Sequence, residues 1–186
     1  GDVEMWKGNL IVFNGTYFNR DVFLDTGKVS FYSGTAFRGD LTTTPKDTIQ
    51  VYSTNSSIFF MGPGHQHVSI LGQYIGGSHT LILDNPSGAT FTGTIHLIGS
   101  DVLQIDEGSW TGPGVFTFGN NNKLVYNHLV SHIATATEWP SVNGPVAVTV
   151  NLEAPSPFNR LYLPGNRNVS GTFQLDDGVV VLENND

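Results

Sequence analysis

Two histidines, His65 and His67, have the spacing of a metal-ligand pair. Side chains two positions apart on a β-strand point to the same face, so both imidazoles could reach one ion. His79 or His96 would have to supply a third ligand. Because the pair directly follows the turn sequence Gly62-Pro63-Gly64, a polar turn is the simpler interpretation, and we predict no metal site there.

A set of carboxylates, Asp84, Asp101, Asp106 and Glu107, forms the second group of chemical candidates. If Asp84 lies one coil away from the other three on a parallel β-helix, the set could provide the acid and base of a glycan-cleaving enzyme. The chain has only 8 Lys and Arg residues, and none is next to these acids. A solvated strand end is therefore the simpler interpretation, and we predict no catalytic residue and no enzyme.

Asp176 and Asp177 offer oxygen atoms of the kind that Ca²⁺ accepts, as does the terminal run 183–186. These residues lack the glycine-rich nine-residue spacing of calcium-binding β-rolls. With Gly178, the two aspartates are also typical of a tight turn. We therefore predict no cofactor, and calcium is the cation that these residues would suit.

Three tryptophans, Trp6, Trp110 and Trp139, are candidates for contact with sugars. An exposed aromatic ring can stack on a sugar ring, although most aromatic residues of β proteins fill cores or corners. Trp139 precedes Pro140 in a polar stretch, so we expect its ring to be exposed. Trp139 and Trp110 are the predicted ligand-binding residues.

Composition limits the classes of partner. The net charge of −8 opposes binding to nucleic acid or to an anionic membrane surface, because both need clustered cations. Cysteine is absent, which excludes disulfides, thiolate nucleophiles and cysteine-based metal sites. No apolar run approaches the length of about 18 residues that spans a membrane. Both ends of the sequence resemble cuts within a longer protein, so we expect any targeting segment to lie outside it.

The elements that would position these residues are short β-strands. About fifteen apolar runs of about four to seven residues are each closed by Gly, Asn or Pro, and no window shows helical periodicity. Thr80-Leu81-Ile82-Leu83 and Thr94-Ile95-His96-Leu97 are typical of strands with one apolar face. Turn residues recur about every 8 to 12 positions, which favours a sandwich, a barrel or a solenoid.

A short repeated motif favours the solenoid. It consists of an aromatic residue or Val, a small polar residue, Gly-Thr and an apolar or aromatic residue, as in Phe13-Asn14-Gly15-Thr16-Tyr17, Phe91-Thr92-Gly93-Thr94-Ile95 and Val169-Ser170-Gly171-Thr172-Phe173. Its spacing predicts a single all-β domain over 1–186, a parallel β-solenoid of about seven to nine coils of about 20 residues. Coil boundaries are expected near Gly15, Gly34, Gly72, Gly93, Gly112, Asn151 and Gly171. A two-sheet β-sandwich is the alternative.

The region 119–182 contains several motifs in a fixed order: Lys123-Leu124-Val125-Tyr126-Asn127, Glu138-Trp139-Pro140, Val148-Thr149-Val150-Asn151, Leu161-Tyr162-Leu163-Pro164-Gly165-Asn166-Arg167 and Val169-Ser170-Gly171-Thr172. This order resembles the repeat unit of very large Bacteroidetes cell-surface proteins, a family that includes gliding adhesins exported by the type IX secretion system. The resemblance implies a β-solenoid stalk with a structural or adhesive role, and it implies no catalytic residue. Residues 1–118 match only in style, with more aromatic residues and a less regular pattern.

The predicted function is therefore that of a non-enzymatic structural or adhesive module of a secreted bacterial cell-surface protein. Its expected partners are glycans or neighbouring surface proteins, without nucleic acid and without membrane insertion of this segment. Two alternatives are a carbohydrate-active β-helix, a lyase or hydrolase that uses the acids between positions 84 and 107, and a carbohydrate-binding β-sandwich that uses Trp139.

Overall fold

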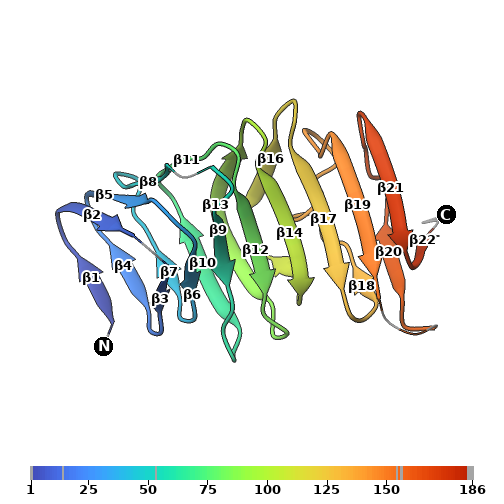
Figure 1. Cartoon of the computed structure of the whole chain (residues 1–186), viewed down its shortest axis with the longest axis horizontal. Helices are drawn as coiled ribbons and strands as arrows, with labels where there is room; N and C mark the ends of the chain where they lie inside the picture. Colours follow the sequence, from blue (N-terminus) through green and yellow to red (C-terminus); the bar gives the residue numbers. More distant parts are fainter. Residues whose placement is uncertain (1, 14, 53, 154, 156, 184–186) are drawn as a thin grey trace.

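The chain forms a parallel β-solenoid. A computed structural model describes residues 2–13, 15–52, 54–153, 155 and 157–183. The described residues contain 22 strands and no helix, so they contain no helix that could span a membrane. The strands lie side by side from one end of the molecule to the other, and the two termini lie at opposite ends (Figure 1).

The longest sheet has eight strands, one from each coil, and extends through the whole molecule. Its strands are β3 (Thr16–Phe18), β6 (Thr35–Phe37), β9 (Ser57–Phe60), β12 (Thr80–Asp84), β14 (Val102–Glu107), β17 (Lys123–His128), β19 (Ala147–Leu152) and β21 (Thr172–Asp177). We call it the long sheet. All its neighbouring strands are parallel, which excludes the sandwich alternative because such a sandwich is built from antiparallel strands.

Three smaller sheets complete the coils. A seven-stranded sheet contains β1 (Val3–Met5), β4 (Val22–Leu24), β7 (Leu41–Thr42), β10 (Gln66–Ile70), β13 (Ala89–Leu97), β15 (Trp110–Thr111) and β16 (Val115–Phe118). A four-stranded sheet contains β2 (Gly8–Val12), β5 (Gly27–Phe31), β8 (Thr48–Val51) and β11 (Gln73–Ile75). Near the C-terminal end, a third sheet contains β18 (His132–Ile133), β20 (Arg160–Pro164) and β22 (Val179–Glu183).

Two columns of inward side chains on the long sheet build much of the core. Side chains alternate between the two faces of a strand, and parallel pairing stacks equivalent positions of successive coils. One column is Thr16, Thr35, Ile58, Leu81, Leu103, Leu124, Val148 and Phe173. The other is Phe18, Phe37, Phe60, Leu83, Ile105, Tyr126, Val150 and Leu175. Both columns are buried between the second and the seventh coil, which confirms an interior of mainly Val, Ile, Leu and Phe.

The solenoid prediction is confirmed, but the glycines mark two different corners. Gly15, Gly34 and Gly171 directly precede strands of the long sheet, whereas Gly93 lies within β13 and Gly112 follows β15. A Cβ atom added at Gly93 would collide with the backbone oxygen of Ile70 in the preceding coil, so close approach of the two backbones requires glycine there. Gly72 lies between β10 and β11, and Asn151 lies inside β19 and marks no corner.

Coil length also varies more than a fixed repeat would allow. Thr16 pairs with Thr35, 19 residues later, whereas Ala147 pairs with Thr172, 25 residues later. The corner before the long sheet repeatedly uses one residue in the left-handed region, with φ between 55° and 63° at Gly15, Asn55, Ser78, Gly99 and Asn143. Residues other than glycine can therefore form this corner, and a search for glycine alone misses it.

Candidate functional site

A buried carboxylate, Glu138, holds the turn between β18 and β19 inside the solenoid. The backbone N–H of Trp110 donates to Oε1 at 2.7 Å, and the N–H of Thr135 donates to Oε2 at 3.1 Å. His132 Nε2 lies 2.9 Å from Oε2, and the Tyr126 hydroxyl donates to the same oxygen at 3.5 Å. Burial, with the neighbouring Glu138 charge, raises the pKa of Tyr126 well above its usual value. These four partners and the complete burial of Glu138 make it a structural anchor that is closed to a substrate.

A second imidazole, His128, lies beside this network without a hydrogen bond of its own. It ends β17, it is 2% exposed, and its ring centroid is 4.5 Å from that of His132. Neither ring nitrogen has a hydrogen-bond partner among the described residues. Burial and then the nearby His132 lower its pKa to about 4, partly opposed by the backbone carbonyl of Gly108, which lies near the ring without forming a hydrogen bond of normal geometry. The ring is therefore neutral at pH 7, with one unused donor and one unused acceptor.

Two adjoining clefts share the side of the molecule where His128 lies. Both are lined by Glu107, His128 and Leu129. The larger cleft has a volume of about 450 Å³ and is otherwise lined by Pro86, Gly108, Ser109, Val130, Ser131, His132 and Ile133. The smaller cleft has a volume of about 220 Å³ and is otherwise lined by Asp84, Asp106, Asn127 and Glu153. We call the two together the His128 groove.

The carboxylates of the groove come from successive coils. Asp84 is paired in register with Glu107, as expected if Asp84 lies one coil away from that acid. Asp106 Oδ1 accepts hydrogen bonds from Gln104 Nε2 at 2.8 Å and from Asn127 Nδ2 at 3.1 Å. Burial and then the Asp106 charge raise the pKa of Asp84. The groove therefore gathers four carboxylates of unlike environments, with no Lys or Arg among its described lining residues.

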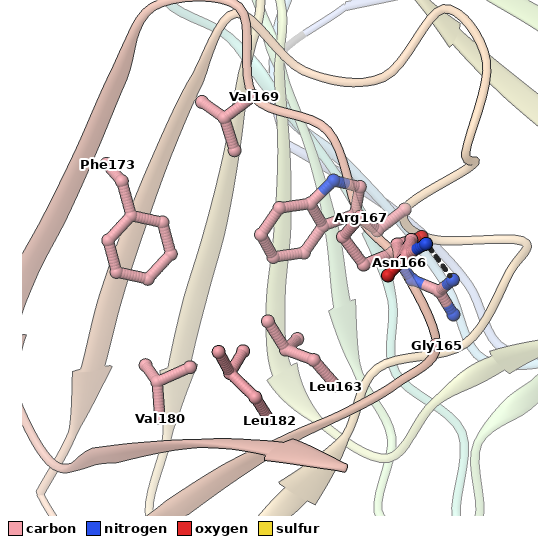
Figure 2. Close-up of a pocket in the computed structure, with 9 residues that line it drawn as sticks. Leu163, Gly165, Asn166, Arg167, Val169, Phe173, Val180 and Leu182 are labelled. Carbon is pink, nitrogen blue, oxygen red and sulfur yellow. Dashed lines mark hydrogen bonds between the residues drawn. The ribbon is translucent and has the colours of Figure 1, made fainter. Parts of the chain in front are cut away.

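A third cavity, of about 420 Å³, lies at the C-terminal end of the solenoid interior (Figure 2). Phe173, Val180, Leu182 and Leu163 extend toward it (Figure 2), and Trp139 also lines it. Phe173 and Leu182 are 42% and 73% exposed, so this apolar cavity is the uncovered end of the core. The cavity reflects an incomplete layer of packing, and its polar groups lie mainly at Asn166 and Arg167.

The predicted exposure of Trp139 is wrong, and Trp110 is buried as well. Each side chain is 1% exposed. The indole N–H of Trp139 donates to the Asn168 backbone oxygen at 3.1 Å, and the adjacent Glu138 turns inward with its hydrogen bonds. Neither ring offers a face to a sugar in this conformation, because core residues cover both. Trp6 is the exposed tryptophan, at 65%.

The predicted metal candidates do not form one cluster, although His65 and His67 are neighbours. His65 and His67 are exposed with ring centroids 5.5 Å apart, but His65 bonds the Ser87 oxygen and Thr90 Oγ1, both at 2.8 Å. His79 is buried elsewhere, and His96 bonds Thr117 Oγ1 at 2.6 Å. Within the described chain, no group of three or more His, Cys, Asp or Glu side chains could hold a metal ion.

The remaining predicted acids have local structural partners. Asp101 is fully buried, accepts the Ile98 N–H at 2.8 Å and lies 2.9 Å from His79 Nδ1. Asp101 therefore does not line the groove, although the sequence analysis grouped it with Asp84, Asp106 and Glu107. Asp176 accepts the Gln174 amide and Asp177 accepts the Gly178 N–H, both at 2.6 Å, as in the tight turn considered for these residues. Their suitability for calcium stays a prediction, and the terminal residues 184–186 lie outside the described residues.

Sequence reasoning missed His128, because residues 128–132 carry no strand-like alternation that would indicate their place in the fold. A signal was present in the spacing of His128 and His132, four residues apart, but only the fold stacks their rings. Comparisons of the chain with protein-family models, with curated proteins and with solved structures found no match. The protein is therefore classified by its fold alone, as a parallel β-solenoid.

Proposed function

We propose that the chain is a non-enzymatic structural or adhesive segment of a secreted bacterial cell-surface protein. The observation that supports this proposal is the uninterrupted long sheet, whose parallel ladder passes through every coil. A tensile load along the solenoid would be shared by many backbone hydrogen bonds and by a core that stacks coil on coil. The motif order of residues 119–182 supports the bacterial surface setting, because it resembles the repeats of Bacteroidetes surface proteins.

The mechanical part of this proposal is tested by stretching the single chain between its ends. We expect cooperative unfolding of successive coils at forces well above those that extend a disordered chain, because each coil must break a strand pair and expose its core. The Glu138→Leu variant should lower the force needed in the region 110–140, whereas Glu4→Gln should not. Extension without force peaks would contradict a mechanical role.

The surface part is tested on intact cells of the bacterium that encodes the chain. Protease added outside the cells should remove the segment, and an antibody against it should label unpermeabilised cells. Protection from protease on intact cells, with release only after lysis, would contradict the surface assignment.

A second candidate, a carbohydrate-active β-helix, is favoured by one observation. Asp84 has a raised pKa and shares a cleft with Asp106 and Glu107, and glycan cleavage needs paired carboxyl groups with different pKa values. A reducing-sugar and unsaturated-uronate assay over mixed polysaccharides tests it. Activity that disappears in both Asp84→Asn and Asp106→Asn would support this enzyme and overturn the non-enzymatic proposal.

A further inference from the structure

The His128 groove has three chemical features that no contact within the described chain uses. The first is the His128 ring itself, which is 2% exposed and whose nitrogens form no hydrogen bond of normal geometry within the described chain. Leaving a buried polar group without a hydrogen bond costs about 1–3 kcal/mol, and native proteins rarely do so. The ring lines both clefts of the groove, where a bound group would be its partner.

The second feature is uncompensated negative charge. Among the described residues, the side chains of Asp84 and Glu107 accept no hydrogen bond and form no ion pair, whereas Asp106 has two amide donors. Since the described lining of the groove contains no Lys or Arg, its carboxylates repel one another and attract a cation.

The third feature is an apolar surface beside these carboxylates. Leu129, Val130 and Ile133 line the larger cleft, and their side chains are 61%, 58% and 60% exposed. A cluster of exposed apolar side chains next to polar groups is typical of a binding site. The larger cleft alone, about 450 Å³, lies within the range of about 300–1,000 Å³ that small-molecule sites occupy.

We propose that the His128 groove binds an amino sugar unit of a glycan, with its ammonium group on the Asp84 and Glu107 carboxylates, a C–H face on Leu129 and Ile133, and a hydroxyl on His128. The ligand chemistry follows from the three features together. A hydroxyl group both donates and accepts, as a neutral imidazole requires. A polyamine or a lysine side chain lacks that hydroxyl, and a neutral sugar lacks the cation.

The His128 nitrogens are shielded from solvent in the unliganded chain. Contact between the hydroxyl and these nitrogens therefore requires a shift of the segment 129–131 between β17 and β18, in which Leu129 and Val130 are exposed. This binding activity goes beyond the structural role proposed above and does not depend on it, because a stalk with or without a glycan site would resist force in the same way.

Calorimetric titration of the full chain at about pH 6 tests the site, since amines are protonated and carboxylates are largely ionised there. The probes are a glucosamine oligosaccharide, the N-acetylated oligosaccharide of the same length, and spermidine. We expect the glucosamine oligosaccharide to bind with a Kd below about 1 mM and the other two to bind at least about tenfold more weakly.

Variants then assign the groups. The double variant Asp84→Asn with Glu107→Gln should weaken binding about tenfold or more, because charge-assisted hydrogen bonds are lost. His128→Leu should weaken binding too, with circular dichroism as a check on folding. Glu4→Gln, an exposed carboxylate on β1 far from the groove, is the matched control and should bind normally.

Four results would each overturn the proposal. These are no binding at about 10 mM glucosamine oligosaccharide, equally tight binding of the acetylated form, equally tight binding of spermidine, and unchanged affinity of the double variant. The second result would show that the ammonium is not recognised, and the third that the hydroxyl is not. The force measurement above is independent of all four results.

Discussion

Equivalent side chains have opposite surroundings in the middle and at the C-terminal end of the solenoid. Leu83 and Ile105 are fully buried, whereas Leu175, in the same inward column, is 48% exposed. The residues are chemically alike and occupy the same position on a strand of the long sheet. The difference therefore comes from the neighbouring coils, because a coil at the end of a solenoid is covered on one side only.

This comparison indicates that each coil is stabilised mainly by the coils packed against it. The fifth to seventh coils combine apolar columns with the buried Glu138 network, whereas all six residues of β21 are exposed. We therefore expect the middle to unfold last and the C-terminal coil to open first.

The largest loss of stability should follow substitution of Glu138, the buried carboxylate described above. Glu138→Leu should lower the free energy of unfolding by about 4–5 kcal/mol, because the Trp110 and Thr135 N–H groups and His132 lose a buried acceptor. Urea unfolding followed by circular dichroism measures the loss. Glu4→Gln should stay within about 0.5 kcal/mol of the wild type, and an equal loss in both variants would contradict the anchor role.

The next prediction compares truncation of a buried and of an exposed member of the same inward column. Ile105→Ala should cost about 3–4 kcal/mol, because it leaves a cavity between two packed coils, whereas Leu175→Ala should cost less than about 1 kcal/mol. Native-state hydrogen exchange should also show lower protection for amides of β21 than for amides of β14. Equal costs for the two substitutions would mean that the last coil is covered by something outside the described residues.

Much of the fold could be predicted from the sequence, but the shortest strands could not. The alternation in Thr80-Leu81-Ile82-Leu83 predicts a strand and its inward face, and the repeated Gly-Thr motif predicts the solenoid. Strands such as β7, β15 and β18 have only two residues, too few for any alternation, so the sequence does not predict them.

The candidate site was less predictable, because its members meet only through the fold. The sequence groups Asp84, Asp106 and Glu107, which do line one cleft. It also adds Asp101, which is buried beside His79 and lies outside that cleft. It places Trp139 outside because the ring precedes Pro140 in a polar stretch, whereas the fold turns the neighbouring Glu138 inward to accept hydrogen bonds from Trp110 and Thr135. Those donors belong to other coils or to a turn without periodicity, and local patterns do not encode them.

A smaller effect concerns pH. The unfolded chain protonates His128 near pH 6.5, but the folded chain does so only at about 4, so the unfolded state binds more protons between these values. The His128 contribution to stability is therefore complete above about pH 6.5 and falls by about 3 kcal/mol as the pH drops to 4. Unfolding measured across this window should lose that dependence in His128→Leu and keep it in His67→Leu, whose ring is exposed. Identical pH profiles in both variants would contradict the assignment.

The smallest effect lies on the outside of the first three coils. Phe13 stacks on Tyr32 at 5.0 Å and Tyr32 on Tyr52 at 4.7 Å between ring centroids. Tyr32→Ala removes both contacts and should cost about 1 kcal/mol. Thermal unfolding measures it against Val142→Ala, an exposed side chain that should cost almost nothing. No difference between the two would mean that these rings do not stabilise the N-terminal coils.

The positions of the three tryptophans have an optical consequence. Trp6 is in contact with water on the first coil, whereas Trp110 is enclosed in the middle of the molecule and Trp139 is buried beside the cavity at the C-terminal end. Acrylamide should quench the emission of Trp6 first and leave a shorter-wavelength component from the enclosed pair. That component reports loss of the coils that enclose the two buried rings, so fluorescence can follow their unfolding without an added label.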